Sequence, residues 1–137
     1  MNNNGLYRLW VPFRPQAQCR PRFNIKTRHA YQPEPLFKDC VVSVAVQQRP
    51  PRPLGGALGV GLKFCFRRPA SRRYEIYKTT KPDLDNVEKP VLDALKRAGW
   101  IVDDACVVKT QCIKVWAETD GLEIVVKPLK NIRNFGE

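Results

Sequence analysis

Residues 81–100 read KPDLDNVEKPVLDALKRAGW, and this stretch combines the clearest helix pattern in the chain with its densest group of acids. Apolar residues recur there at every third or fourth position: Leu84, Val87, Val91, Leu92, Leu95 and Ala98. This spacing puts them on one face of an α-helix. Gly99 predicts the end of the helix, because glycine is favoured where the chain leaves a helix in a left-handed conformation.

The start of this helix depends on Pro90. Proline fits the first turn of a helix, where its missing N–H has no acceptor to lose. We therefore expect regular helix from about Val87 to Lys89 onward, with residues 83–86 in a turn before it. A kinked helix that begins at Asp83 is the alternative.

Around this helix, the sequence predicts strands and a second helix. Four runs are apolar or alternate in the way that is typical of strands: Leu6–Val11, 58–66, 107–115 and 122–126. A turn at Asp120-Gly121 predicts that the last two strands form a C-terminal hairpin. Apolar residues at helical spacing predict a helix from Pro35 to about Gln48. The expected fold class is α+β, with one domain over residues 1–137, a mixed sheet of about four strands and two main helices.

Basic charge is concentrated in the N-terminal part of the chain. Residues 1–82 hold 16 of the 24 Lys and Arg residues and three acids, whereas residues 83–137 hold eight bases and ten acids. The net charge of +11 favours a polyanionic partner, with nucleic acid ahead of a membrane because no basic amphipathic helix stands out.

Two segments are candidates for DNA contact. Residues 12–35 form an expected irregular arm in which basic residues alternate with aromatics, a mixture suited to phosphate contact and base stacking. Residues 67–82 form a basic loop that leads into the acidic stretch. The basic residues that we expect to contact DNA are Arg20, Arg22, Lys26, Arg28, Arg72, Arg73 and Lys81. A solvated loop is the alternative interpretation of the arm.

Other classes of protein are disfavoured. The five cysteines are odd in number, include no C-x-x-C pair and are accompanied by a single histidine, so neither a disulfide framework nor a zinc site is indicated. No run approaches the roughly 18 apolar residues of a membrane span, and the first residues do not form a signal peptide. We expect a cytoplasmic protein with no membrane partner, and a loosely ordered tail over residues 128–137.

Six acids fall within residues 83–104: Asp83, Asp85, Glu88, Asp93, Asp103 and Asp104. Carboxylates on a DNA-binding protein are useful where a divalent cation offsets them at a phosphate. Asp83 and Asp85 can point at one ion from a turn, and Asp103-Asp104 offers a third ligand if the loops at the two helix ends meet. Lys89 and the helix N-terminus would add positive charge there.

Structural roles explain the same acids equally well from spacing alone. Asp85 would cap the helix, with Glu88 completing a capping box. Asp103 and Asp104 would be turn residues, and Asp93 would pair along the helix with Lys89, Lys96 or Arg97. A calcium-binding loop is disfavoured because its glycine and distal glutamate are missing.

The long pattern D-L-D-N, K-P-V-L-D-A-L and D-D-A-C-V-V over residues 83–108 closely resembles RusA-type Holliday junction resolvases, which are small and often prophage-encoded endonucleases. Arg20-Pro21-Arg22-Phe23 with Ala30-Tyr31 resembles a segment of phage-type members. The core match covers about residues 81–115. Residues 50–61 and 71–80 depart from the family pattern.

The resemblance implies roles for individual residues. Asp83, Asp85 and Asp104 would hold Mg²⁺, with Mn²⁺ as a substitute, and Lys89 would match the catalytic lysine. Asn86 and Asp103 would have supporting roles. The implied protein is a homodimer that resolves four-way DNA junctions in recombination and repair, without a small-molecule cofactor. A non-catalytic nucleic-acid-binding domain and a metal-dependent nuclease for other branched DNA or RNA are the alternatives.

Overall fold

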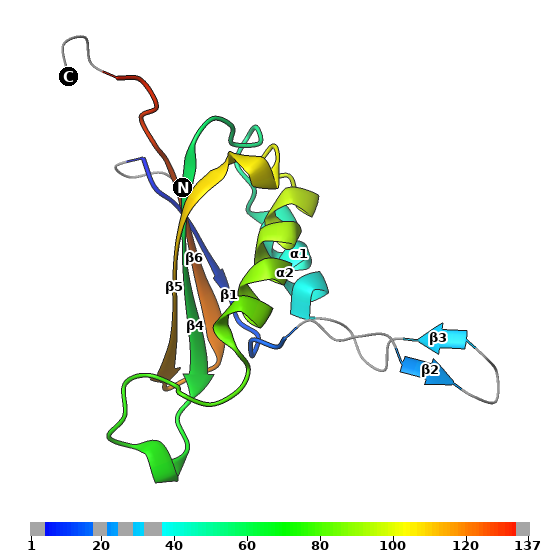
Figure 1. Ribbon diagram of the computed structural model, residues 1–137, viewed down its shortest axis with the longest axis vertical. Helices are drawn as coiled ribbons and strands as arrows, with labels where there is room; N and C mark the ends of the chain where they lie inside the picture. The colour runs from blue at the N-terminus through cyan, green and yellow to red at the C-terminus, as the bar shows by residue number, and fades with distance from the viewer. Residues whose placement is uncertain (1–4, 18–21, 25–28, 32–36, 134–137) are drawn as a thin grey trace.

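The computed structural model describes residues 5–17, 22–24, 29–31 and 37–133 of the chain. In this part, one mixed sheet has the strand order β1 (Tyr7–Val11), β6 (Gly121–Pro128), β4 (Leu58–Arg67) and β5 (Val107–Ala117). Helices α1 (Phe37–Gln47) and α2 (Leu84–Arg97) lie together on one face of this sheet (Figure 1). The predicted α+β class, with a four-stranded mixed sheet and two main helices, is confirmed.

The core lies between the helices and the sheet. Every second residue of β4 is buried towards the helices, from Leu58 to Phe66, and β6 contributes Leu122, Ile124 and Val126 in the same way. Five buried residues of α2 face them: Val87, Pro90, Val91, Ala94 and Leu95. The helical and strand periodicities of the sequence therefore meet in one apolar layer.

The predicted C-terminal hairpin is wrong. Strands β5 and β6 follow each other in sequence, but β4 lies between them and pairs with both, parallel to β5 and antiparallel to β6. Cys65 of β4, for example, pairs with Val115 on one side and Gly121 on the other. The Asp120-Gly121 turn does reverse the chain, but a reversal leaves open whether a third strand inserts between the two arms.

The preferred start of this helix, at Val87 to Lys89, is wrong, and the alternative start at Asp83 is within one residue of the observed one. Helix α2 begins at Leu84, with Asp83 as its N-cap residue, and continues through Pro90. Asp85 and Asn86 therefore lie in the first helical turn and not in a turn before the helix. Pro90 is buried, and its burial in the core offsets the loss of the hydrogen bond that a residue with an N–H would donate to Asn86.

The end of α2 was predicted correctly. Gly99 follows it with φ +80°, and the Gly99 and Trp100 amides donate to the carbonyls of Lys96 and Leu95. Buried Trp100 then donates from its indole Nε1 to the Ala45 carbonyl of α1 at 2.8 Å. This bond fixes the segment after α2 against α1.

Part of the arm is ordered into strands, whereas the sequence predicted irregular structure. Strands β2 (Arg22–Asn24) and β3 (His29–Tyr31) pair antiparallel, with Phe23 opposite Ala30. They form a sheet of their own (Figure 1). Arg20, Lys26 and Arg28 lie outside the described residues, as does the end of the predicted tail.

Helix α2 connects the parallel strands β4 and β5 and so runs opposite to them (Figure 1). Its first residues lie at the end of the sheet where β4 stops. Its last residues lie near the start of β5, which the short 3-10 helix η2 (Asp104–Cys106) precedes. Among the described residues, no helix is long and apolar enough to cross a membrane.

Candidate active site

The first turn of α2 carries the paired aspartates. Asp83 adopts an extended conformation as N-cap, but its side chain makes no capping hydrogen bond. Its carboxylate instead pairs with the exposed Lys81 ammonium at 2.9 Å. Asp85 is exposed, and its carboxylate makes no hydrogen bond or ion pair within the described part of the chain. The positive end of the helix dipole favours both negative charges at this position.

A shallow pocket of about 220 Å³ runs along the outer side of α2. It is lined by Asp85, Glu88, Lys89, Leu92, Asp93 and Asp104. Because residues three or four apart share one face of a helix, α2 alone supplies five of these six side chains. The pocket brings together three of the predicted site residues, Asp85, Lys89 and Asp104.

Asp104 enters the pocket from η2. One of its carboxylate oxygens, Oδ1, is buried and has no hydrogen-bond partner. A buried carboxylate oxygen without a partner is costly, because the protein does not replace the hydration that the oxygen loses. A cation or a hydrogen-bond donor from a substrate would satisfy it.

Asp103 has a structural role next to it. Its side chain accepts a hydrogen bond from the Asp104 amide at 2.8 Å and pairs with Lys96 at 3.1 Å. The hydrogen bond from Lys96, with that from the Asp104 amide, lowers the pKa of Asp103. These contacts hold η2 against the last turn of α2 and so position Asp104.

The expected meeting of all the acids does not occur within one chain. Asp83 precedes α2, whose 14 residues span about 21 Å, and η2 lies near the opposite end of the helix (Figure 1). Asp83 does not line the pocket. Within the described residues there is no group of three or more His, Cys, Asp or Glu side chains arranged to hold a metal ion.

Two of the alternative structural roles are wrong. Asp85 is not the N-cap of α2, because Asp83 occupies that position. Asp93 pairs with Lys38 of α1 at 3.6 Å and not with a lysine or arginine of its own helix. The close packing of α1 against α2 provides this partner, which spacing along one helix does not reveal.

Two residues that line the pocket were not among the predicted site residues. Glu88 and Asp93 line the pocket, and their spacing from Asp85 and Lys89 is the signal that identifies them, since all four lie on one helical face. Burial, together with the Glu88 carboxylate, raises the pKa of the Cys112 thiol of β5 to about 12. Glu88 therefore lies between the pocket and the sheet.

Lys114 was also missed. From β5, its Nζ donates to the backbone carbonyls of Thr80 at 2.8 Å and Pro82 at 2.7 Å. These bonds fix the chain immediately before Asp83. No local pattern identifies this role, because the two partners are more than 30 residues away in the sequence.

The predicted DNA-contact residues are placed only in part. Arg22 lies in β2. Arg72 pairs with Glu75 at 3.1 Å, and the guanidinium of Arg73 lies 5.0 Å from the ring centre of Tyr74. Arg73 and Lys81 are both exposed, and Lys81 lies two residues before Asp83, where positive charge can attract a phosphate backbone.

The carboxylate oxygens in the pocket are of the chemical type that binds hard cations. Mg²⁺ binds through one or two carboxylates and completes its shell with waters and substrate phosphate oxygens. Asp85 and Asp104 offer two carboxylates, and the unpartnered oxygen of Asp104 is the clearest single ligand. Lys89 lines the same pocket as these two carboxylates.

Comparison with known proteins finds a matching family model and proteins of similar sequence. Residues 12–127 match the family model described as Endodeoxyribonuclease RusA. An uncharacterized protein of Bacillus subtilis, YqaN, is 31% identical over 128 residues, covering 82% of this chain and 89% of the relative. The crossover junction endodeoxyribonucleases RusA of Escherichia coli K12 and of Enterobacteria phage 82 are each 27% identical, covering 91% of this chain and 97% of the relative.

Proposed function

Because the chain belongs to the RusA endodeoxyribonuclease family, we propose that it is a Mg²⁺-dependent endonuclease that cuts four-way DNA junctions in recombination and repair. The relatives from E. coli and phage 82 are named crossover junction endodeoxyribonucleases, which supports this substrate. The pocket with Asp85, Lys89 and Asp104 is the structural observation that carries the proposal.

The acids and the lysine that the resemblance pointed to have separate roles in this proposal. Asp85 and Asp104 hold Mg²⁺, with Mn²⁺ as a substitute. Asp83 lies outside the pocket of its own chain, so its carboxylate would join such a site only from a second copy of the chain. A cation held there supplies positive charge against the negative charge that develops on the phosphate during hydrolysis. Lys89 binds and orients the scissile phosphate from the adjacent turn of α2, and Asp103 keeps Asp104 in place through η2.

We further propose that the active form is a homodimer in the cytoplasm. Two symmetric cuts in a four-way junction need two active sites, and a twofold dimer provides them. The incomplete set of metal-binding side chains within the described part of one chain is consistent with a site that needs additional ligands. Sedimentation velocity, with and without junction DNA, measures the oligomeric state.

The central experiment is cleavage of a labelled four-way junction and of a linear duplex with the same sequence. Each substrate is incubated with Mg²⁺ or with EDTA, using the unchanged protein, Asp85→Asn and Asp104→Asn. Glu118→Gln is the control, because it also removes one negative charge but at an exposed residue outside the pocket.

We expect paired nicks near the branch point of the junction, only with Mg²⁺, in the unchanged protein and in Glu118→Gln. Asp85→Asn and Asp104→Asn should bind the junction and fail to cut it. Tight binding without cleavage under any metal condition would identify a DNA-binding module. Cleavage of forks or RNA in preference to the junction would assign the same site to a different branched substrate.

A further inference from the structure

The loop at residues 68–82, between β4 and α2, exposes large apolar side chains. Tyr74 is 87% exposed, Ile76 66% and Tyr77 60%. Five bases and one acid accompany them: Arg68, Arg72, Arg73, Lys78, Lys81 and Glu75. Large apolar side chains that are exposed close together mark candidate interaction sites.

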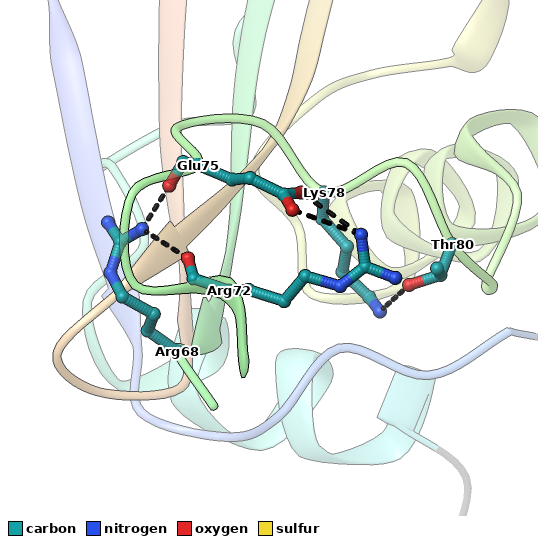
Figure 2. Close-up of polar contacts among 5 residues, drawn as sticks. All are labelled: Arg68, Arg72, Glu75, Lys78 and Thr80. Carbon is teal, nitrogen blue, oxygen red and sulfur yellow. Dashed lines mark hydrogen bonds and ion pairs between the residues drawn. The ribbon is translucent and has the colours of Figure 1, made fainter. Parts of the chain in front are cut away.

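The loop is held in shape by Arg68. Its guanidinium donates to the backbone carbonyls of Arg72 and Glu75 within the loop (Figure 2). It also donates, at the longer distance of 3.4 Å, to the Trp116 carbonyl of β5. The Arg72 side chain in turn pairs with the Glu75 carboxylate at 3.1 Å (Figure 2). The segment that carries Tyr74 is therefore closed by bonds across its base.

Lys78 anchors the other side of the loop. It is only 7% exposed, and its ammonium lies 4.6 Å from the Trp116 ring centre and 5.1 Å from that of Phe66. It also donates to the Thr80 hydroxyl at 2.6 Å (Figure 2). Burial and three basic neighbours, of which Arg14 is the strongest, lower the pKa of Lys78. The cation is thus fixed by aromatic rings and not by an acid.

Backbone hydrogen bonds also join the loop to β5. The Trp116 amide donates to the Ile76 carbonyl at 2.9 Å, and the Lys78 amide donates to the Lys114 carbonyl at 3.1 Å. Tyr77 forms an antiparallel bridge with Val115. The segment 76–78 therefore lies along the outer edge of β5, and the exposed rings belong to a braced element and not to a flexible loop.

We propose that loop 68–82 recognises branched DNA by stacking the rings of Tyr74 and Tyr77 on bases that are unpaired or unstacked at the branch point. Basic grooves with aromatic platforms are the usual means of binding single-stranded nucleic acid. The excess of basic residues favours a polyanion over a protein surface. Arg73 lies over the Tyr74 ring at 5.0 Å, so that ring and charge are presented together.

The position of the loop fits this role. It lies where β4 ends and α2 begins (Figure 1). Its last residues are fixed to β5 by Lys114, immediately before Asp83. Bases held by Tyr74 and Tyr77 would therefore lie at the same end of the sheet as the first turn of α2. This inference rests on the proposed junction substrate, and it names the element that selects it.

The test compares Tyr74→Ala/Tyr77→Ala with Tyr74→Phe/Tyr77→Phe. The second pair keeps the aromatic faces and removes only the hydroxyls. Binding to a four-way junction and to a matched linear duplex is measured in EDTA, with 2-aminopurine placed at the branch point or within an arm. Cleavage of the same junction is measured with Mg²⁺, and urea unfolding midpoints show whether both pairs fold as the unchanged protein does.

We expect the alanine pair to bind the junction at least about tenfold more weakly, with duplex binding almost unchanged. The fluorescence change of 2-aminopurine should occur only at the branch point and should be lost in the alanine pair. The phenylalanine pair should behave as the unchanged protein does. Equal losses for alanine and phenylalanine, or an unchanged ratio of junction to duplex affinity, would overturn the proposal.

The two proposals can fail separately. If the unchanged protein cuts the junction and the alanine pair still binds it with full preference, the loop proposal fails and the nuclease proposal stands. If no cleavage occurs, but the alanine pair loses the preference for DNA with unpaired bases, the loop proposal stands and the nuclease proposal fails.

Discussion

Lys114 of β5 donates a hydrogen bond to the backbone carbonyl of Pro82 at 2.7 Å, one residue before Asp83. A second bond reaches the Thr80 carbonyl at 2.8 Å. The Lys114 side chain therefore connects the sheet, loop 68–82 and the chain just before α2. The position of Asp83 depends on this contact between segments that are far apart in the sequence.

Lys114→Met should loosen the chain at residues 80–83, because both carbonyls lose their donor. We expect a loss of about 1–2 kcal/mol in unfolding free energy, faster amide exchange in this segment and slower junction cleavage. Lys109→Met is the matched control, since it removes the charge of an exposed lysine on the same strand. Equal effects of the two variants would mean that charge, and not the two bonds, is responsible.

Asp104→Asn should separate stability from activity. The Asp104 Oδ1 atom is buried without a partner, so removal of the negative charge relieves an unfavourable burial. In EDTA we expect the unfolding free energy to stay constant or rise by about 0.5–1 kcal/mol, while junction cleavage falls at least about 100-fold.

Added Mg²⁺ provides the second measurement for this variant. Mg²⁺ should raise the melting temperature of the unchanged protein and leave that of Asp104→Asn almost constant, because ligands stabilise the state that binds them. A clear destabilisation of Asp104→Asn in EDTA would show instead that the carboxylate is important for folding.

Gly121→Ala should disturb the packing of Trp10. A Cβ atom at Gly121 would overlap the ring of Trp10, which crosses β6 from β1. Because the ring is 44% exposed, it can swing outward, and we expect a loss of about 1–3 kcal/mol with red-shifted tryptophan fluorescence. In the control Gly61→Ala, the nearest contact of the new Cβ atom would be at 3.9 Å. A similar loss of unfolding free energy in Gly61→Ala would show that replacing any strand glycine has this effect, without a specific overlap with Trp10.

The Cys112 thiol should remain protonated well into the alkaline range. Burial and the Glu88 carboxylate raise its pKa from 9.0 to about 12 in the folded protein. Since the folded pKa is above the unfolded value, the resulting stabilisation is complete below pH 9 and is lost as the pH rises towards 12. In Cys112→Ala, this part of the alkaline decrease in unfolding free energy should be absent.

Alkylation provides a direct measurement of the same group. Iodoacetamide reacts with the thiolate, so labelling of Cys112 at pH 9 should be at least about tenfold slower in the folded protein than in urea. Peptide mass spectrometry assigns the label. Equal rates in the two states would contradict the raised pKa.

The individual elements were predictable because they depend on local chemistry. Alternation identified β4, and a three-to-four-residue repeat with a final glycine identified α2 and its end. The start of α2 was not predictable by the proline rule. The core covers Pro90 and compensates for its missing hydrogen bond, and such compensation is not a local property.

The candidate site was predictable only in its parts. The sequence indicated Asp85, Lys89 and Asp104, and the structure places them along one pocket. The partner of Asp93 came from α1, and the Thr80 and Pro82 carbonyls received their donor from β5. Contacts of this kind follow from which elements pack together, for which the spacing of residues carries no signal.

The sequence by itself determined the α+β class, through its apolar periodicity, and pointed to the family, through the resemblance of the motif over residues 83–108. It also indicated candidate site residues, because their spacing is a local pattern of the chain. Only the tertiary structure decided that β4 lies between β5 and β6, that Asp83 and Asp104 lie near opposite ends of α2, and that Tyr74 and Tyr77 are held in exposed positions. The reason is that packing and hydrogen bonds between segments far apart in the sequence set the order of the strands, the direction of the helix and the shape of the loop.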